Sequence, residues 1–118
     1  MKGTKASSSK ERVDYVVDCL NMAVGGNIST RAMMGEYVVY YRDKVLGGIY
    51  DNRLLIKPTA SALAMLPDAT REIPYPGAKE MVRVDDLEDR EFLQELLLAI
   101  YPELPERKAR KKKATDGF

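Results

Sequence analysis

The sequence predicts an α+β fold in two layers, with about three helices packed on an antiparallel β-sheet of about five to six strands. Three short runs of β-branched, aromatic and leucine residues between residues 37 and 57 are separated by polar turn-forming pairs, as expected for a central three-stranded meander. Apolar residues at helical spacing precede this meander and follow it. With 118 residues, 45% of them hydrophobic, the chain is long enough for a single core. We therefore expect one domain, residues 10–104, between a flexible leader, residues 1–9, and a disordered basic tail, residues 105–118.

The first helix is predicted to begin after Ser8 and to continue to about Val24. Ser8 and Glu11 match the capping box S-x-x-E, in which the serine hydroxyl accepts a hydrogen bond from a backbone amide of the first turn. Apolar side chains recur on one helical face of this segment, and these are Val13, Val16, Val17, Leu20 and Val24. Gly25 and Gly26 are expected to end the helix.

Extended segments are expected next, joined by tight turns. They span residues 28–34, 37–41, 45–50 and 53–57. Asp51 and Asn52 both tolerate the positive φ that a two-residue hairpin turn requires. Arg42 and Asp43 suit such a turn less well, so a longer loop is the alternative at that position. Gly35 is expected to make the corner between the first two segments.

Two-residue turns at both positions would place alternate strand residues on two shared faces. The first face would hold Val38, Tyr40, Val45, Gly47, Ile49, Leu54 and Ile56. The second face would hold Tyr37, Val39, Tyr41, Leu46, Gly48, Tyr50, Leu55 and Lys57. Both faces are apolar, so one should pack against helices and the other needs a further explanation. A protein partner or a second copy of the chain is one explanation, and coverage by the C-terminal segment is the other.

Part of the second face, together with two cations near it, forms the candidate partner surface. Its residues are Tyr37, Val39, Leu46, Tyr50, Leu55, Arg31 and Lys57. Arg31 and Lys57 are candidate contacts for an anion or an acidic partner. The structural alternative is that Arg31 forms a surface ion pair with Glu36 or Glu72, and it is favoured because no glycine-rich phosphate loop opens a helix here.

The glycine pair at residues 47–48 indicates a β-bulge or the close approach of another backbone to the strand. A helix packed tightly on the sheet is the favoured interpretation. A ligand held in a pocket near the central sheet is the alternative, and it would make the chain a small-molecule-binding domain.

The remainder of the domain predicts two helices and two short strands. The helices are expected at residues 59–66 and from residue 89 or 90 to about residue 101. The strands are expected at residues 73–75 and 80–84. Thr59 is the expected cap of the first of these helices, and Pro67 ends it. The acidic run from Asp85 to Asp89 is interpreted as the approach to the last helix, whose dipole it complements, and not as a metal loop.

Charge is distributed unevenly along the chain, whose net charge is +1. Residues 1–104 contain 13 Lys and Arg against 16 Asp and Glu, whereas residues 105–118 contain 6 against 2. The tail cations are Arg107, Lys108, Arg110, Lys111, Lys112 and Lys113. Such a run could neutralise phosphates and bind nucleic acid weakly, without sequence specificity and in a salt-sensitive way. The alternative is a solvated, disordered end.

Composition disfavours several classes of function. The chain has no histidine, and the single Cys19 has no partner for an internal disulfide, so neither a zinc site nor a cofactor is predicted. The usual general base near neutral pH is also missing, so no catalytic residue is assigned and the protein is expected not to be an enzyme. No apolar run is long enough for a bilayer, and residues 1–10 lack the apolar core of a signal peptide. A cytoplasmic location without membrane contact is therefore expected.

One segment also resembles a known family. The run RAMMGEYVVYYRDKVLGGIYDNRLLIKP, residues 31–58, follows a helix containing ERVDYVVDCL and precedes a Pro-Tyr-Pro-Gly turn at residues 74–77. In these features, over roughly residues 10–101, the chain resembles the N-terminal domain of the TfoX/Sxy family of bacterial competence regulators, also called DNA transformation proteins. The most specific matches lie at residues 31–35, 41–43 and 51–57. None of them is a catalytic signature.

The resemblance implies a two-layer domain that takes part in transcription regulation through protein contacts. Full-length members of the family work with the cyclic-AMP receptor protein at competence promoters and carry an additional C-terminal helical domain, to which no part of this sequence corresponds. We therefore expect a non-enzymatic regulatory domain that acts through a protein partner or through self-association as a dimer. Weak nucleic-acid binding through the tail and small-molecule binding near the central sheet are the alternatives.

Overall fold

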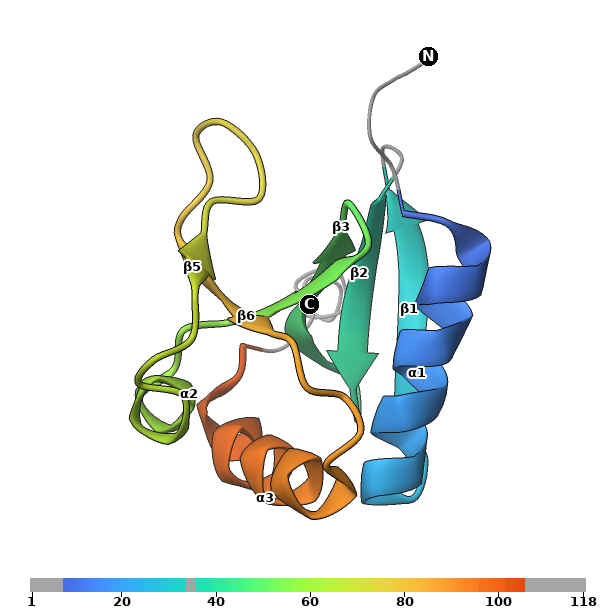
Figure 1. The fold of residues 1–118 in the computed structure, drawn as a ribbon, viewed down its shortest axis with the longest axis vertical. Helices are drawn as coiled ribbons and strands as arrows, with labels where there is room; N and C mark the ends of the chain where they lie inside the picture. Colours follow the sequence, from blue (N-terminus) through green and yellow to red (C-terminus); the bar gives the residue numbers. More distant parts are fainter. Residues whose placement is uncertain (1–7, 34–35, 106–118) are drawn as a thin grey trace, which may run out of the picture.

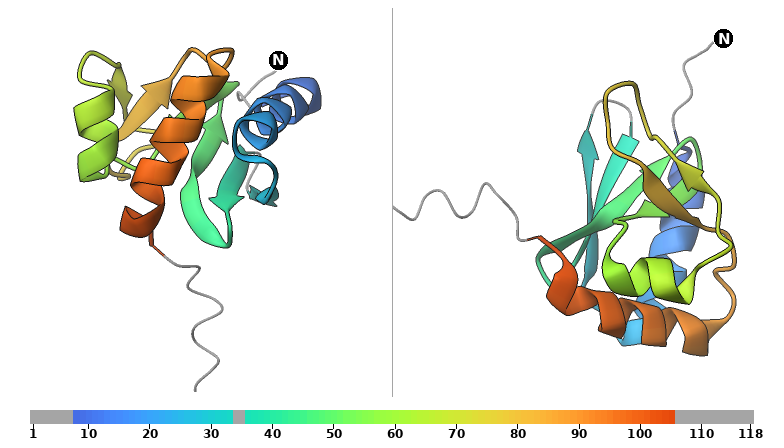
Figure 2. Two further views of the ribbon diagram at one scale, coloured as in Figure 1. Left: turned by 90° about the horizontal axis from the view of Figure 1, so that it is seen from below. Right: turned by 90° about the vertical axis from the view of Figure 1, so that its left-hand side faces the viewer.

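Six antiparallel strands form one sheet in the computed structural model, and three helices pack on one of its faces (Figure 1; Figure 2). The structure describes residues 8–33 and 36–105. The strands are β1 (Ile28–Met33), β2 (Glu36–Tyr41), β3 (Lys44–Tyr50), β4 (Arg53–Ile56), β5 (Arg71–Glu72) and β6 (Met81–Val84), in the order β1-β2-β3-β4-β6-β5. The helices are α1 (Lys10–Val24), α2 (Ala60–Met65) and α3 (Arg90–Ile100), and a 3-10 turn, η1 (Tyr101–Glu103), follows α3. The predicted α+β fold is confirmed.

The cap of α1 lies one residue later than the sequence predicted. The Ser9 hydroxyl accepts from the Arg12 backbone amide at 3.1 Å, so the predicted capping box of Ser8 and Glu11 is wrong. Ser8 is instead nearly buried, and its hydroxyl donates to the Glu36 carboxylate at 2.8 Å. The hydrogen bond from Ser8 to Glu36 therefore replaces the predicted cap, and Ser9 caps the helix instead. The helix ends as predicted, at Gly25 with φ of 78°.

The meander is confirmed, and both of its hairpins have two-residue turns. Asp51 and Asn52 have φ of 53° and 65°, and Arg42 and Asp43 have φ of 50° and 69°. The longer loop considered at Arg42 and Asp43 is therefore wrong, because both residues adopt the left-handed conformation of a tight hairpin. The predicted extended segment 28–34 forms β1 up to Met33, whereas residue 34 and the corner at Gly35 lie outside the described residues.

A β-bulge in the first hairpin changes which residues share a face. Tyr40 lies opposite Val45, but Val39 lies opposite Gly47, so Leu46 is the additional residue. Beyond the bulge every pairing is shifted by one residue, and the predicted division of the strands into two faces is wrong there. Val39 consequently lies on the same face as Ile49, beneath the helices.

The two mid-strand glycines allow two close approaches, neither of which involves a helix. A Cβ on Gly47 would overlap the backbone of β4 at Leu55 and Ile56. A Cβ on Gly48 would lie 2.5 Å from the ring of Tyr50, which lies over it. The predicted bulge and close contact are confirmed, but the favoured helix contact is wrong, because β4 and an aromatic ring occupy these positions.

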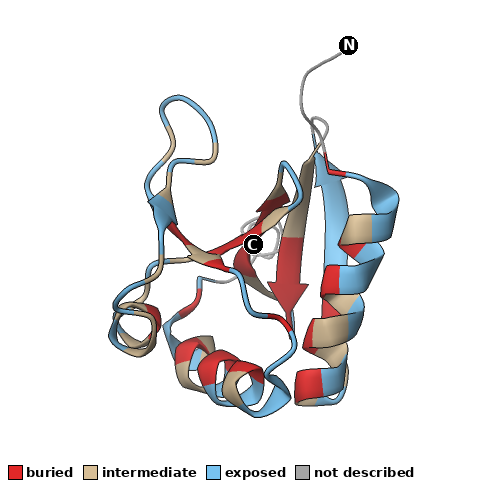
Figure 3. Cartoon of the chain, in the orientation of Figure 1, coloured by how far each residue is buried: buried red, intermediate tan, exposed pale blue. Residues whose placement is uncertain are grey.

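The core lies between the sheet and the three helices, and its residues are coloured as buried in Figure 3. Its best buried members expose 2% or less of their surface, and they include Leu20, Val39, Leu46, Ile49, Leu54, Ile56, Leu93, Leu96, Leu97 and Ile100. α3 contacts both α1 and α2 and so completes the helical layer (Figure 1). No helix in the described ranges, 8–33 and 36–105, is long and apolar enough to cross a membrane.

The C-terminal half agrees with the sequence except at one strand. Thr59 caps α2 as predicted, and Asp89, the last residue of the predicted acidic approach, caps α3. Both side-chain oxygens accept from backbone amides. The strand predicted at residues 73–75 is wrong, because β5 stops at Glu72 and the chain leaves the sheet. Prolines at positions 74 and 76 lack the N–H groups that a ladder needs, so Tyr75 between them projects from a loop.

Candidate functional site

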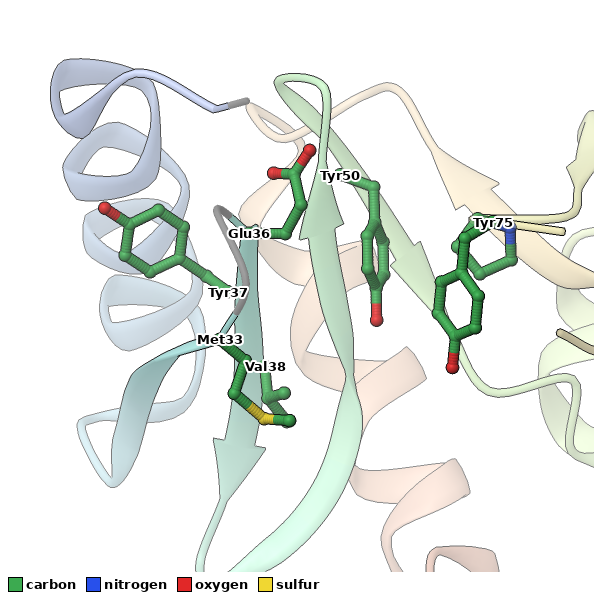
Figure 4. Close-up of a pocket in the computed structure, with 7 residues that line it drawn as sticks. Met33, Glu36, Tyr37, Val38, Tyr50 and Tyr75 are labelled. Atoms are coloured by element: carbon green, nitrogen blue, oxygen red, sulfur yellow. The ribbon is translucent and has the colours of Figure 1, made fainter. Parts of the chain in front are cut away.

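A groove of about 550 Å³ lies on the sheet face opposite the helices (Figure 4). It is lined by Met33 of β1, Glu36 and Val38 of β2, Tyr50 of β3, and Pro74 and Tyr75 of the β5–β6 loop. Tyr37 borders it as well, but its ring points away toward α1 (Figure 4). We call this feature the helix-free groove.

Strand register brings the lining residues together from three strands. Met33 lies opposite Glu36, and Arg31 lies opposite Val38, so these four side chains share one face of the β1–β2 pair. Val38 in turn lies opposite Gly48. Because glycine has no side chain, the neighbouring aromatic ring on β3 can lie flat over this position and form part of the groove wall.

Two tyrosines from distant parts of the chain form the second wall. The ring centroids of Tyr50 and Tyr75 are 6.3 Å apart and their planes are tilted by 57°. Tyr75 and Met33, which come from opposite sides of the groove, expose 57% and 47% of their surface. Partial burial raises the pKa of Tyr50, with further contributions from Tyr75 and from the Glu36 carboxylate. The Tyr50 hydroxyl therefore stays protonated at neutral pH and can donate a hydrogen bond.

Glu36 at the upper end of the groove is fully engaged in structural hydrogen bonds. Its carboxylate accepts from the Ser8 amide at 3.1 Å, the Ser8 hydroxyl at 2.8 Å and the Asp51 amide at 3.0 Å. The Asn52 amide donates to the Ser8 hydroxyl at 2.9 Å. These bonds join the start of the described chain to β2 and to the β3–β4 turn, so we call them the Glu36 node. Their geometry indicates a structural carboxylate and not a free base.

An ion-pair network lies on the same face of the sheet, on the neighbouring strands β4, β6 and β5. Glu72 pairs with both Arg53 and Arg83, the latter at 2.7 Å, and Arg83 also lies 2.8 Å from Asp85. The hydrogen bonds to Asp85 and then Glu72 raise the pKa of Arg83 above its ordinary value. The strands β4, β5 and β6 are thus joined by charges that are already compensated.

Arg31 differs from these arginines. It is exposed on β1, next to Val38, and no carboxylate in the described part of the chain pairs with it. The ion pair with Glu36 or Glu72 that the sequence suggested is wrong. The Glu36 carboxylate is taken by the Glu36 node, and Glu72 lies on the opposite edge strand, where it pairs with two other arginines.

The candidate partner surface is divided by the structure. Val39 and Leu46 lie in the core beneath the helices, so their assignment to a surface is wrong, and the bulge is the reason. Leu55 is buried outside the main core cluster, on the face of Gly48. Tyr50 lies in the helix-free groove, and Arg31 lies on the same face.

The last two predicted partner residues lie elsewhere. Tyr37 packs against the core, and the half-buried Lys57 follows β4 and donates its amide to the Leu46 carbonyl at 2.9 Å. Sequence reasoning missed Met33, Val38 and Tyr75 as groove residues. The exposed aromatic between two prolines was the available signal for Tyr75, whereas the faces of the other two depend on the register.

A second feature lies at the opposite end of the β2–β3 hairpin. Arg42 and Lys44 lie 5.1 Å and 4.4 Å from the centre of the Tyr101 ring, as cation–π contacts. The Val45 amide donates to the Pro105 carbonyl at 3.0 Å, so the described chain ends beside these two cations. The predicted nucleic-acid residues lie outside the described residues, and they are Arg107, Lys108, Arg110, Lys111, Lys112 and Lys113.

Acidic and thiol groups elsewhere have structural roles. Asp89 caps α3 and the Asp86 carboxylate accepts from the Glu88 amide at 3.0 Å, in agreement with the predicted helix approach. Within residues 8–33 and 36–105, no group of three His, Cys, Asp or Glu side chains could hold a metal ion. Cys19 is half-buried beside the core.

Comparison with known proteins gives one relative. The chain is 37% identical over 111 residues to an "uncharacterized 12.7 kDa protein in trpE 5' region" of Spirochaeta aurantia, and the alignment covers 93% of this chain and 91% of that protein. No protein-family model matches the chain. No solved structure matches it significantly.

Proposed function

The chain belongs to the same family as this Spirochaeta aurantia protein, and we propose that it is a non-enzymatic regulatory domain that binds a protein partner through the helix-free groove. One observation carries the proposal: exposed apolar and aromatic side chains from β1 and the β5–β6 loop face each other across a cavity that none of the helices in the described part of the chain covers. Met33 and Tyr75 expose about half of their surface there. Concentrated apolar exposure of this kind is typical of interaction surfaces.

The chemistry of the lining supports binding in preference to catalysis. Glu36 supplies the groove carboxylate, and three donors already satisfy it. The Tyr50 phenol, whose pKa is raised, is a hydrogen-bond donor and not a base at neutral pH. A small molecule would also fit a volume of about 550 Å³. The open, apolar walls favour a peptide segment because they leave few polar groups to orient a small ligand.

The resemblance to the TfoX/Sxy N-terminal domain adds a biological setting to this proposal. It supports a cytoplasmic bacterial protein that affects transcription, competence in particular, by contacting another protein. In this setting the helix-free groove is the contact surface, and the helices on the other face serve to hold the sheet.

The proposal can be tested by site-specific photo-crosslinking in cells of the organism that encodes the protein. A photoreactive phenylalanine derivative would replace Tyr75 in the groove or, as the matched control, Met22 on α1. The two residues expose nearly the same surface, 57% and 58%. We expect a discrete crosslinked protein from position 75 and none from position 22. Equal crosslinking from both positions, or none from position 75, would contradict a partner site in the groove.

Nucleic-acid binding is the second candidate function, and one observation favours it. The described chain ends at Pro105, whose carbonyl accepts from the Val45 amide beside two cations, Arg42 and Lys44, and the basic run follows Pro105 in the sequence. A fluorescence titration of duplex DNA with the full chain and with a chain ending at Pro105 tests this. The candidate requires binding by the full chain alone, weakening steeply with salt, and salt-independent binding would count against it.

A further inference from the structure

We infer that the partner contributes an extended segment with an acidic residue. This segment adds to the edge strand β1, places its carboxylate on Arg31 and packs an apolar side chain against Met33 at the border of the helix-free groove. The inference rests on the proposed protein-binding function and specifies the chemistry of the partner. Three features of the described residues carry it: the open edge of β1, the uncompensated charge beside the groove and the spacing of the residues involved.

The outer edge of β1 is available to another strand. Among residues 8–33 and 36–105, β1 pairs only with β2, and five of its six residues are exposed. The Ile28 amide donates to the Asn21 side chain at 3.1 Å and so points away from β2. Because backbone groups alternate along a strand, Thr30 and Ala32 direct their N–H and C=O groups to the same outer side. An extended peptide can satisfy these groups by β-augmentation.

The charge around the groove selects an acidic partner. Arg31 lies opposite Val38 in the groove lining, and within the described residues no carboxylate compensates it. The nearby Glu36 is fully engaged by other donors, and Glu72 lies on β5, at the opposite edge of the sheet. A guanidinium in this position can form a charge-assisted, bidentate hydrogen bond with an incoming carboxylate.

The same charge disfavours two other occupants. The basic tail of this chain carries 6 Lys and Arg against 2 Asp and Glu, so Arg31 would repel it. A second copy paired antiparallel through β1, with the helix-free faces continuous, would bring the two Arg31 side chains opposite or diagonal to each other. Like charges in these positions destabilise a strand pair.

Strand geometry predicts the spacing of the ligand residues. Arg31 and Met33 lie two residues apart on one face of β1. A strand paired with β1 presents side chains to that face at the same interval. The acidic residue of the partner and its apolar anchor are therefore two residues apart, and the apolar one lies next to Met33 at the β1 border of the groove. The acidic residue can precede or follow the apolar residue in the partner sequence, depending on whether the added strand runs parallel or antiparallel to β1.

The test is selection from a phage-displayed library of random 12-residue peptides on the full chain, on Arg31→Glu and on Arg71→Glu. Arg71 is the matched control because it is an exposed arginine on the other edge strand, β5. We expect the wild type and Arg71→Glu to enrich peptides with Asp or Glu two residues from an apolar residue. Arg31→Glu should lose these peptides, and the Kd of a synthetic selected peptide should rise roughly tenfold.

Every other result overturns the inference. Enriched peptides without the acidic residue, or equal binding by Arg31→Glu, would remove the acidic partner while leaving a protein-binding groove in place. If no variant enriches any peptide, the inference is overturned but the proposed function is not, because crosslinking from position 75 tests that function separately. A wild-type chain that dimerises through β1 in sedimentation would show a second copy as the occupant instead.

Discussion

The two faces of the sheet are built from the same strands but differ in chemistry. The helix-covered face is mostly aliphatic, and its central residues, such as Val39 and Ile49, are fully buried. The helix-free face carries tyrosines, the Glu36 node, an ion-pair network and the uncompensated Arg31. The difference teaches that apolar content alone does not distinguish a packing face from a binding face. The two kinds of face are distinguished by whether their polar groups already have hydrogen-bond or ion-pair partners.

The largest difference between the faces should appear in stability. Leu96→Ala leaves a cavity between α3 and the sheet and should lower the free energy of unfolding by about 2–5 kcal/mol. Val38→Ala, on the partly exposed helix-free face, should lower it by about 1 kcal/mol or less. Urea denaturation of both variants measures the contrast. Equal losses would mean that the helix-free face is also a core.

The second largest effect on stability is expected at the Glu36 node. Glu36→Ala removes the acceptor for three hydrogen bonds and leaves the nearly buried Ser8 without its carboxylate partner, at a cost of about 1.5–3 kcal/mol. Glu80→Ala is a suitable control, because that glutamate is exposed and should change stability by less than about 0.5 kcal/mol. Similar urea midpoints for the two variants would show that the node contributes nothing to stability.

Gly48→Ala should alter the groove with a smaller effect on stability. The added methyl group would lie 2.5 Å from the Tyr50 ring, which must then move into the groove. We expect a loss of about 1–2 kcal/mol in stability and weaker binding of selected peptides. Isothermal titration measures the binding. Unchanged affinity together with an unchanged Tyr50 NMR signal would show that this ring does not form the wall.

The smallest expected effect is on how the stability of the fold depends on pH. Because the pKa of Tyr50 is raised in the folded state, protonation of this tyrosine contributes stability that is fully present below the unfolded pKa near 10 and is lost as the pH rises above it. Tyr50→Phe should reduce this alkaline loss. Thermal unfolding between pH 8 and pH 11 measures it, and identical curves for the variant and the wild type would contradict the partial burial of the phenol.

Much of the fold could be predicted from local patterns. The Val and Leu stripes, the Gly25 stop, the Thr59 cap and the start of α3 depend on neighbouring residues only, and all of them are confirmed. The face assignment failed because one additional residue, Leu46, shifts the register. The position of such a bulge depends on how two strands pair, which the local sequence does not specify.

The candidate site was predicted less completely, for a related reason. The Glu36 node joins residues 28 and 15 positions apart, and the Tyr50–Tyr75 wall joins two segments that the fold alone brings together. The sequence offered Arg31 as a candidate contact for an acidic partner but favoured an ion pair. The absence of that pair depends on the Glu36 node and on the strand order, which places Glu72 at the opposite edge of the sheet. Such information exists only in the folded molecule.

The most direct test of the account is NMR mapping of the bound surface. A selected acidic peptide would be titrated into the ¹⁵N-labelled full chain, and amide shifts on the helix-free face would be compared with those on the exposed helix positions Met22 and Leu98. The account predicts the largest shifts at residues 30–33, Val38 and Tyr75. Shifts centred on α1 or α3 would contradict it, and would assign the binding surface to the helical layer.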